Sequence, residues 1–203
     1  DRLIEKNFFI KLGINTTNFF EINSLKDLVR KLNINDNSFL LKTRKFGYDG
    51  KGQIKLDKKK ITSINLKITK NNFIIDEYIK FEKEISVIVI RKKNGNCICY
   101  EPSENFHKNG ILRETKFPAD ISNKCILRAK KLAKKIAEKL NIVGILAVEM
   151  FVCENEKLFI NEIAPRPHNS GHWTMDACNI SQFEALVRVI FDLPIEKIKY
   201  FNK

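Results

Sequence analysis

Residues 146–151 read Leu-Ala-Val-Glu-Met-Phe and residues 159–164 read Phe-Ile-Asn-Glu-Ile-Ala, and both segments have the apolar character of buried strands. A turn at 154–157 would join them into a hairpin in which Glu149 and Glu162 lie opposite each other. Two neighbouring carboxylates on buried strands repel each other unless a cation lies between them. Mg²⁺ binds carboxylate oxygens together with nucleotide phosphates, so we predict that Glu149 and Glu162 are magnesium ligands. The alternative places both acids on a solvent-exposed face, opposite basic side chains.

The segment after the second strand is polar and rich in proline: Ala164-Pro165-Arg166-Pro167-His168-Asn169-Ser170-Gly171-His172. Arg166 can bind an oxyanion through two parallel N–H groups, and His168 and Asn169 can donate to the same anion. The alternative is an ordinary surface loop with a capping Asn. Because the segment directly follows Glu162, we favour the anion-binding interpretation.

A second candidate site is the glycine-rich loop Gly47-Tyr48-Asp49-Gly50-Lys51-Gly52-Gln53. Glycines allow consecutive backbone N–H groups to converge on an anion, and Lys42 and Lys51 add charges suited to phosphate oxygens. The loop lacks the Gly-Lys-Ser/Thr ending of a Walker A motif. Taken alone, a loop with three glycines is more often a plain turn than a phosphate-binding loop.

The segment Asp76-Glu77-Tyr78-Ile79, followed by Glu84, ends an apolar run in acids. The backbone of such a strand can hydrogen-bond an adenine edge, and the later carboxylate can bind a ribose hydroxyl. On sequence alone, however, the segment indicates an ordinary strand with acidic ends, and it would not be nominated without further information.

Apolar spacing predicts helices over 2–12, over 25–32 behind a Ser24/Asp27 capping box, over 122–140, and from Ser181 to just before Pro194. Strands are predicted over 39–41, 73–79, 84–91, 97–100, 145–153 and 157–163, with a hairpin turn at Asn94-Gly95. The stretch 57–70 is ambiguous between helix and strand. The order of elements predicts an α+β chain with mixed or antiparallel sheets, in two lobes that enclose a cleft.

The composition is that of a soluble globular protein, since 43% of the 203 residues are hydrophobic and 30% are charged. No apolar run approaches the roughly 20 residues that span a bilayer, and we expect no membrane partner. The five cysteines form no CxxC pair and no cluster with the three histidines, which indicates reduced cysteines in a cytoplasmic protein rather than a zinc site. The net charge of +13 permits nucleic-acid binding, but the densest basic block, 124–139, fits the solvated face of one helix.

Taken in order, these motifs resemble the ATP-grasp core of the N5-carboxyaminoimidazole ribonucleotide synthetases, a family of purine-synthesis ligases. The matching segments are Lys42-Thr43-Arg44 with the loop 47–53, Phe81-Glu82-Lys83-Glu84-Ile85-Ser86, Glu104-Asn105-Phe106-His107, the segment 161–172 and Ser181-Gln182-Phe183-Glu184. The resemblance extends over essentially the whole chain, and 161–172 is its most specific part.

The resemblance implies an ATP-grasp fold with a nucleotide cleft, and a reaction in which ATP and bicarbonate form carboxyphosphate. The carboxyl group then passes to 5-aminoimidazole ribonucleotide, leaving ADP and phosphate. Glu149 and Glu162 would hold Mg²⁺, and the catalytic residues Arg166, His168 and Asn169 would face the bicarbonate or carboxyphosphate. The implied ATP contacts are Arg2, Lys42, Gly47, Tyr48, Asp49, Gly50, Lys51, Gly52, Gln53, Asp76, Glu77, Tyr78, Ile79, Glu84, His107, Asn161 and Glu162.

The resemblance also implies a domain organisation. Residues 1–78 would form the small lobe with the glycine loop, its N-terminal helix packing on the large lobe, and residues 79–203 would form the large lobe. The family's N-terminal substrate domain and small C-terminal domain are missing from these residues, so residues 1–203 alone are expected to bind MgATP without full turnover. The full-length enzyme is expected to be a homodimer.

Three departures and three alternatives accompany the resemblance. Phe46 stands where the family often has a small residue, Asp76 stands where Glu is usual, and the Lys-rich stretch 57–70 is poorer in helix than the family leads one to expect. A formate-dependent glycinamide ribonucleotide transformylase or a biotin carboxylase would share the fold, but Tyr48-Asp49 and the Pro-Arg-Pro-His-Asn run argue against both. A non-catalytic basic module that binds nucleic acid would not explain two facing acids on apolar strands.

Overall fold

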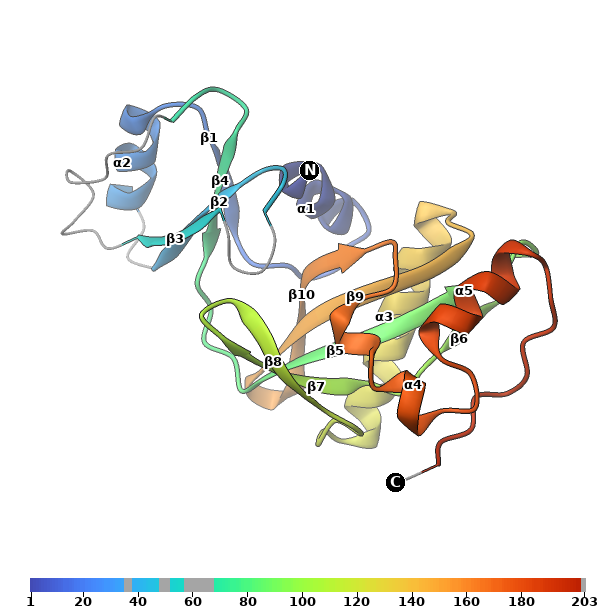
Figure 1. The fold of residues 1–203 in the computed structure, drawn as a ribbon. Helices are drawn as coiled ribbons and strands as arrows, with labels where there is room; N and C mark the ends of the chain where they lie inside the picture. The colour runs from blue at the N-terminus through green and yellow to red at the C-terminus, as the bar shows by residue number, and fades with distance from the viewer. Residues whose placement is uncertain (35–37, 48–51, 57–67, 202–203) are drawn as a thin grey trace. The chain divides into compact units, whose positions relative to one another are not determined.

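The computed structural model describes residues 1–34, 38–47, 52–56 and 68–201 (Figure 1). The chain forms two compact units, Asp1–Lys80 with Asn109–Ile111, and Phe81–Lys108 with Leu112–Lys203. Both units combine helices with antiparallel strands, so the predicted α+β class is confirmed. Within the described ranges, none of the helices is long and apolar enough to cross a membrane.

The first unit contains a four-stranded antiparallel sheet in the order β1 (Phe19–Ile22), β4 (Phe73–Glu77), β2 (Phe39–Thr43) and β3 (Gln53–Leu56). Helix α2 (Leu25–Ile34) packs on this sheet, and Leu28 and Leu32 join the apolar side chains of the strands in one core. The predicted capping bond is present, since the Asp27 N–H donates to Ser24 Oγ over 3.1 Å.

Helix α1 (Arg2–Lys11) begins at Asp1, whose carboxylate accepts from the N–H groups of Leu3 and Ile4. It ends before Gly13, which adopts a φ of +65°. By its contacts α1 is grouped with the first unit.

The second unit contains a sheet in the order β10 (Lys157–Ala164), β9 (Gly144–Cys153), β5 (Lys83–Arg91), β7 (Ser103–Lys108) and β8 (Ile111–Lys116). The short strand β6 (Cys97–Cys99) pairs with β5 across the predicted turn at Asn94-Gly95. Strands β5 and β9 are almost entirely buried along their length, which explains their continuous apolar sequences.

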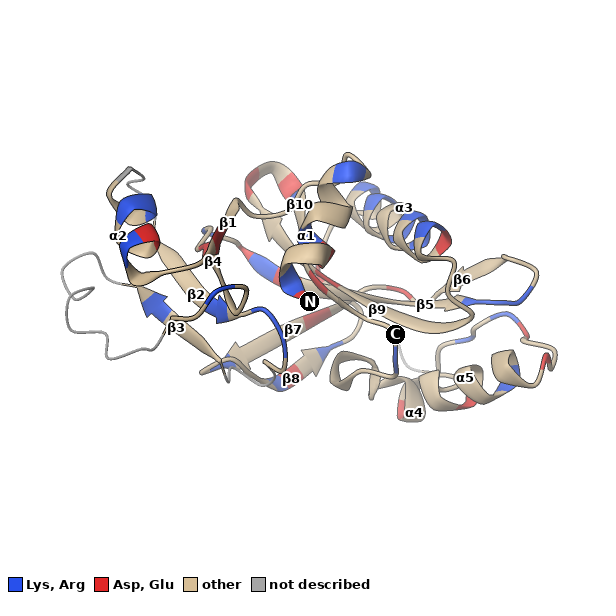
Figure 2. Ribbon diagram, turned by 90° about the horizontal axis from the view of Figure 1, so that it is seen from above, with Lys and Arg blue, Asp and Glu red and all other residues tan. Residues whose placement is uncertain are grey.

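Helices cover both faces of this sheet: α3 (Asn123–Leu140) lies on one side, and α4 (Thr174–Ala177) and α5 (Gln182–Ile190) lie on the other (Figure 2). Ile88 and Ile90 of β5 share a core with Ala185 and Val189 of α5. The lysines of the basic block lie along α3 while its small apolar residues are buried, so the prediction of a solvated helix face is confirmed. An isolated β-bridge joins Cys178, which precedes α5, to Tyr200, which follows it.

The predicted helices and the predicted apolar strands are confirmed to within a few residues. Strands β1, β3, β7 and β8 were not predicted. The prediction for 57–70 falls mostly on residues 57–67, which lie outside the described residues.

Candidate active site

Glu149 on β9 and Glu162 on β10 lie directly opposite each other, as the sequence predicted. The strands pair in one register from Lys157 to Ile160, and this register, continued by one residue, would place Asn161 opposite Glu149. The register shifts by one residue between Ile160 and Glu162, and this β-bulge at Asn161 is what aligns the two acids. Bulges of this kind occur often beside active sites because they redirect a side chain.

The surroundings of Glu149 do not neutralise its charge. Its side chain is buried, with 9% of the residue exposed, and its Oε1 has no hydrogen-bond partner among the described residues. Burial raises the pKa of Glu149 to about 8, and the neighbouring charge of Glu162 adds to the shift. A buried carboxylate oxygen without a partner, next to a second carboxylate, fits a divalent cation that binds both.

In the part of the chain that the structure describes, no three His, Cys, Asp or Glu side chains form a group that would hold a metal ion by themselves. A pair of glutamates suits Mg²⁺, which commonly takes one or two carboxylates and completes its octahedron with waters and substrate phosphates.

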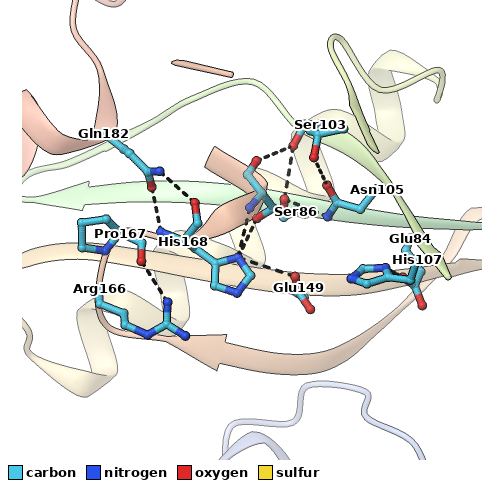
Figure 3. A network of polar contacts seen from close by, with 12 residues as sticks. Glu84, Ser86, Ser103, Asn105, His107, Glu149, Arg166, Pro167, His168 and Gln182 are labelled. Atoms are coloured by element: carbon cyan, nitrogen blue, oxygen red, sulfur yellow. Dashed lines mark hydrogen bonds and ion pairs between the residues drawn. The ribbon is translucent and has the colours of Figure 1, made fainter. Parts of the chain in front are cut away.

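Glu84 on β5 and His107 on β7 form an ion pair through Oε2 and Nδ1 (Figure 3). The hydrogen bond to Glu84 raises the pKa of His107, and the charges of Glu84, Glu149 and Glu162 act in the same direction. This pair and Glu149 line one shallow hollow of the second unit; its lining residues are Glu84, Ile85, Asn105, His107, Glu149, Met150, Phe151 and Asn161. Four residues that the sequence nominated thus meet in one place.

The loop after β10 carries His168 toward Glu149 (Figure 3). His168 Nδ1 lies 2.9 Å from Ser170 Oγ and 3.7 Å from Glu149 Oε1. Burial lowers the pKa of His168, and the nearby Arg166 lowers it further, so the ring is favoured in its neutral form. Arg166 and Asn169 lie exposed on the same loop, where Arg166 Nη1 donates to the carbonyl of Pro167.

In the first unit, Lys42 belongs to a buried ionic cluster. Its Nζ donates to Asp76 Oδ2 over 2.6 Å, and Lys6 Nζ of α1 donates to Asp76 Oδ1 over 2.8 Å. The hydroxyl of Thr17 donates to the same Asp76 oxygen. Two lysines share one carboxylate, so the cluster carries a net positive charge that suits a nearby anion.

Asp76 was nominated from the sequence as a nucleotide contact, but the residue is 2% exposed and its carboxylate is bonded to Lys6, Lys42 and Thr17. Burial alone would raise the pKa of Asp76, but the charges of Lys42 and Lys6 outweigh it and lower the pKa. In this structure the Asp76 carboxylate is bonded to side chains of the chain itself, and it holds Lys42 in place.

The other nominated residues are spread over the first unit. Arg2 begins α1, and its N–H donates to the carbonyl of Arg44. Glu77, Tyr78 and Ile79 end β4 or follow it, and Lys55 Nζ lies 4.7 Å from the centre of the half-exposed Tyr78 ring. Of the glycine loop, the structure describes three residues, Gly47, Gly52 and Gln53; Tyr48, Asp49, Gly50 and Lys51 lie outside the described residues.

Gly52 and Gln53 show how the loop closes. Gln53 lies opposite Lys42 in the β2–β3 ladder, and the Thr43 N–H donates to the carbonyl of Gly52 over 2.8 Å. The φ of Gly52 is +74°, and a Cβ there would lie 2.6 Å from Thr43 Oγ1. Only glycine satisfies both conditions.

Sequence reasoning missed Lys6 in the first unit and Gln182 in the second. Lys6 is buried on the same face of α1 as Phe9, and a lysine at helical spacing from a buried aromatic residue was the available signal. Gln182 lies in a segment quoted for its resemblance, but nothing in its immediate neighbourhood pointed to a role.

The comparisons with known proteins agree with this geometry. The family described as "ATP-grasp domain" matches residues 7–183, and the chain therefore belongs to the ATP-grasp family. The N5-carboxyaminoimidazole ribonucleotide synthase of Brucella melitensis is 39% identical over 198 residues, which is 96% of this chain and 55% of that protein.

Solved structures give the same result. The N5-carboxyaminoimidazole synthetase of Staphylococcus aureus complexed with ADP superimposes with a TM-score of 0.90 at 33% identity, over 98% of this chain and 54% of that one. The N5-carboxyaminoimidazole synthase of Aspergillus clavatus, in complex with ADP and 5-aminoimidazole ribonucleotide, gives a TM-score of 0.85 at 27% identity, over 97% of this chain and 52% of that one. The chain spans about half the length of these relatives.

Proposed function

We propose that the protein containing this chain carboxylates 5-aminoimidazole ribonucleotide with bicarbonate, using ATP, and that residues 1–203 provide its nucleotide-binding core. The observation that carries the proposal is the bulge-aligned pair Glu149 and Glu162, in which a buried oxygen of Glu149 has no hydrogen-bond partner in the described part of the chain. The names of the relatives support the choice of reaction within the ATP-grasp family, and one of the solved structures is a complex with ADP and the ribonucleotide.

In the proposed mechanism Lys42 and the glycine loop bind the phosphates of ATP. The cluster with Asp76 and Lys6 fixes the Lys42 amine, so little side-chain entropy is lost when a phosphate binds. The remaining nominated contacts, which are Arg2, residues 76–79, Glu84, His107 and Asn161, would position the base, the ribose and the terminal phosphate. Catalysis of phosphoryl transfer depends mainly on such positioning and on charge stabilisation.

Glu149 and Glu162 would hold the magnesium ion, which supplies positive charge to the phosphate oxygens when it is bound. Bicarbonate oxygen attacks the terminal phosphorus of ATP, the bond from that phosphorus to the bridging oxygen breaks, and ADP leaves carboxyphosphate behind. Arg166, His168 and Asn169 would bind this anion, with His168 acting as a neutral hydrogen-bond donor. The amine of the ribonucleotide then attacks the carboxyl carbon, and phosphate leaves.

The test is the dependence of ATP cleavage on the second substrate, measured with the full-length protein. ADP release is expected to require both bicarbonate and 5-aminoimidazole ribonucleotide, with formation of the carbamate. Stimulation by formate with glycinamide ribonucleotide, or by biotin, would instead assign the chain to another branch of the family. Residues 1–203 alone are expected to bind MgATP without complete turnover.

We also propose a cytoplasmic location and, for the full-length protein, a homodimer. Five unpaired cysteines, four of them buried, suit a reducing compartment. Sedimentation of the full-length protein tests the assembly, and a monomer at micromolar concentration would contradict it.

A further inference from the structure

Gln182, the first residue of α5, makes an unusual set of contacts with the loop that carries His168. Its Oε1 accepts from the N–H of His168 over 2.9 Å, and its Nε2 donates to the carbonyl of the same residue over 2.8 Å (Figure 3). One side chain therefore binds both backbone groups of a single residue, as a neighbouring strand would. This fixes the backbone position from which the His168 ring projects.

The two hydrogen bonds from the Gln182 amide to the His168 backbone form a clamp, and Gln182 is itself held in place. Gln182 is fully buried, and its N–H donates to Thr174 Oγ1 over 2.9 Å. The Thr174 hydroxyl in turn donates to the carbonyl of Gly171 over 2.6 Å. The loop and the start of α5 are thus joined by a chain of hydrogen bonds among groups shielded from water, where each bond counts for more than at the surface.

Gly171 adapts the loop to this clamp. Its φ lies outside the left-handed region, so its backbone conformation does not require glycine. A Cβ at this position, however, would lie 2.5 Å from Gln182 Oε1 and 2.8 Å from Gln182 Cδ. The absence of a side chain at 171 therefore serves the Gln182 amide.

The opposite side of the loop is held as well. Ser103 Oγ of β7 donates to the carbonyl of Ser170 over 3.2 Å, and Ser170 Oγ lies 2.9 Å from His168 Nδ1. The ring is thus oriented through Nδ1 while its backbone is held by Gln182. Among the described residues, Nε2 has no hydrogen-bond partner and remains available to a ligand.

We propose that Gln182 is the positioning residue for the anion-binding loop, and that Gly171 is required only because the Gln182 amide occupies the space beside it. The proposal rests on the proposed function, in which His168 and its neighbours bind bicarbonate or carboxyphosphate. Gln182 touches neither substrate; it acts through the His168 backbone. Its loss therefore affects the bicarbonate steps and leaves ATP binding intact.

The experiment compares Gln182→Met, Gln182→Ala and Gly171→Ala with the parent in the full-length protein. A displacement of about 1 Å in an active-site group lowers rates by up to about 100-fold, so kcat/KM for bicarbonate is expected to fall about 10- to 100-fold in each variant. The dissociation constant of MgATP is expected to stay within about twofold of the parent. Gly171→Ala keeps every polar group, so a fall in its kcat/KM for bicarbonate would report displacement of Gln182.

Tyr100→Phe is the matched control. It removes one fully buried hydrogen bond, from the Tyr100 hydroxyl to the carbonyl of Ile180, two residues before Gln182. It is expected to lower stability while leaving kcat/KM for bicarbonate unchanged. Equal kinetic losses in Tyr100→Phe and Gln182→Met would overturn the positioning role.

A double-mutant cycle isolates the contact between the two residues. In the Gln182→Ala background the space beside residue 171 is open, so adding Gly171→Ala is expected to cause almost no further loss in kcat/KM. Fully additive losses would show that Gly171 serves something other than Gln182.

Hydrogen exchange provides a readout that does not depend on the reaction. Amide exchange in a peptide spanning 166–172 is expected to accelerate at least tenfold in Gln182→Met and to stay at the parent rate in Tyr100→Phe. Unchanged exchange in Gln182→Met would refute the clamp even if the protein carried out a different reaction. Absence of bicarbonate-dependent turnover in the parent, with accelerated exchange in the variant, would refute the proposed function and keep the clamp.

Discussion

Asp76 and Glu149 are both nearly buried carboxylates, but their surroundings have opposite electrostatic consequences. Burial opposes ionisation in both, and at Asp76 the charges of Lys42 and Lys6 outweigh it, so the pKa of Asp76 is lowered. At Glu149 burial is reinforced by Glu162, and its pKa is raised to about 8. The first carboxylate already has its counter-ions within the chain. The second has the properties of a ligand for an added cation.

Replacement of Asp76 by Asn tests the buried cluster at the scale of one residue. The change keeps the shape but leaves Lys6 and Lys42 buried together without a counter-ion, and the expected loss is roughly 3–5 kcal/mol of unfolding free energy. Lys6→Met is expected to cost less, because it leaves a balanced pair between Asp76 and Lys42. Urea denaturation measures both, and an Asp76→Asn protein as stable as Lys6→Met would contradict this assignment.

The same cluster has a pH dependence whose sign follows from the lowered pKa of Asp76. The pKa of the carboxyl in the unfolded chain is near 3.8, and the pKa in the folded protein is lower. Its contribution to stability is therefore fully present above the unfolded pKa and is lost as pH falls toward the folded pKa. The stability difference between the parent and Asp76→Asn should thus shrink as pH falls below about 4.

Among the structural elements, those with strong apolar periodicity could be predicted and the polar ones could not. Strands β5 and β9 are buried over nearly their whole length and carry an unambiguous pattern. Strands β3 and β8 lie at sheet edges and half of the residues in each are exposed, so their pairing depends on distant partners rather than on local sequence. Local patterns contain no information about such pairing.

The residues of the candidate site could be predicted only in part, because some of its contacts join segments that are distant in the sequence. The sequence predicted that Glu149 and Glu162 face each other across a hairpin, but it did not predict the bulge at Asn161 that aligns them. Lys6 meets Asp76 seventy residues away, and Gln182 meets His168 through its backbone; neither contact has a sequence signature. Long-range hydrogen bonds of this kind become visible only in the folded chain.

Gly52→Ala tests the closure of the β2–β3 hairpin. The added Cβ meets Thr43 Oγ1, and the positive φ adds about 1–2 kcal/mol of backbone strain. We expect lower stability and, because Gly52 ends the phosphate-binding loop in the proposed function, at least tenfold weaker MgATP binding by calorimetry.

Gly13→Ala is the matched control for this change. Gly13 has a similar φ of +65°, but a Cβ there would have no atom within 4 Å. It should show the backbone strain without the clash and with parent-like affinity for MgATP. Equal effects of the two variants on nucleotide binding would show that the loop does not depend on the close approach of Gly52 to Thr43.

For the whole molecule, part of the formal net charge of +13 comes from the lysines of α3. The lysines of α3 lie on its solvated face, where Lys130 pairs with Glu101 over 2.6 Å and Arg128 donates to the carbonyl of Glu156. The charge that matters for the proposed function is local: a positive cluster around Asp76 in one unit and the acid pair in the other.

The measurement that tests the acid pair most directly is calorimetry of MgATP binding by the parent and by Glu162→Gln. Glu162→Gln removes one of two proposed metal ligands, so MgATP affinity is expected to fall at least about tenfold, while ATP without Mg²⁺ binds both proteins alike. Glu154→Gln makes the same change in charge at the exposed turn of the same hairpin and should bind MgATP like the parent. Equal affinities of the parent and Glu162→Gln for MgATP would contradict the magnesium site.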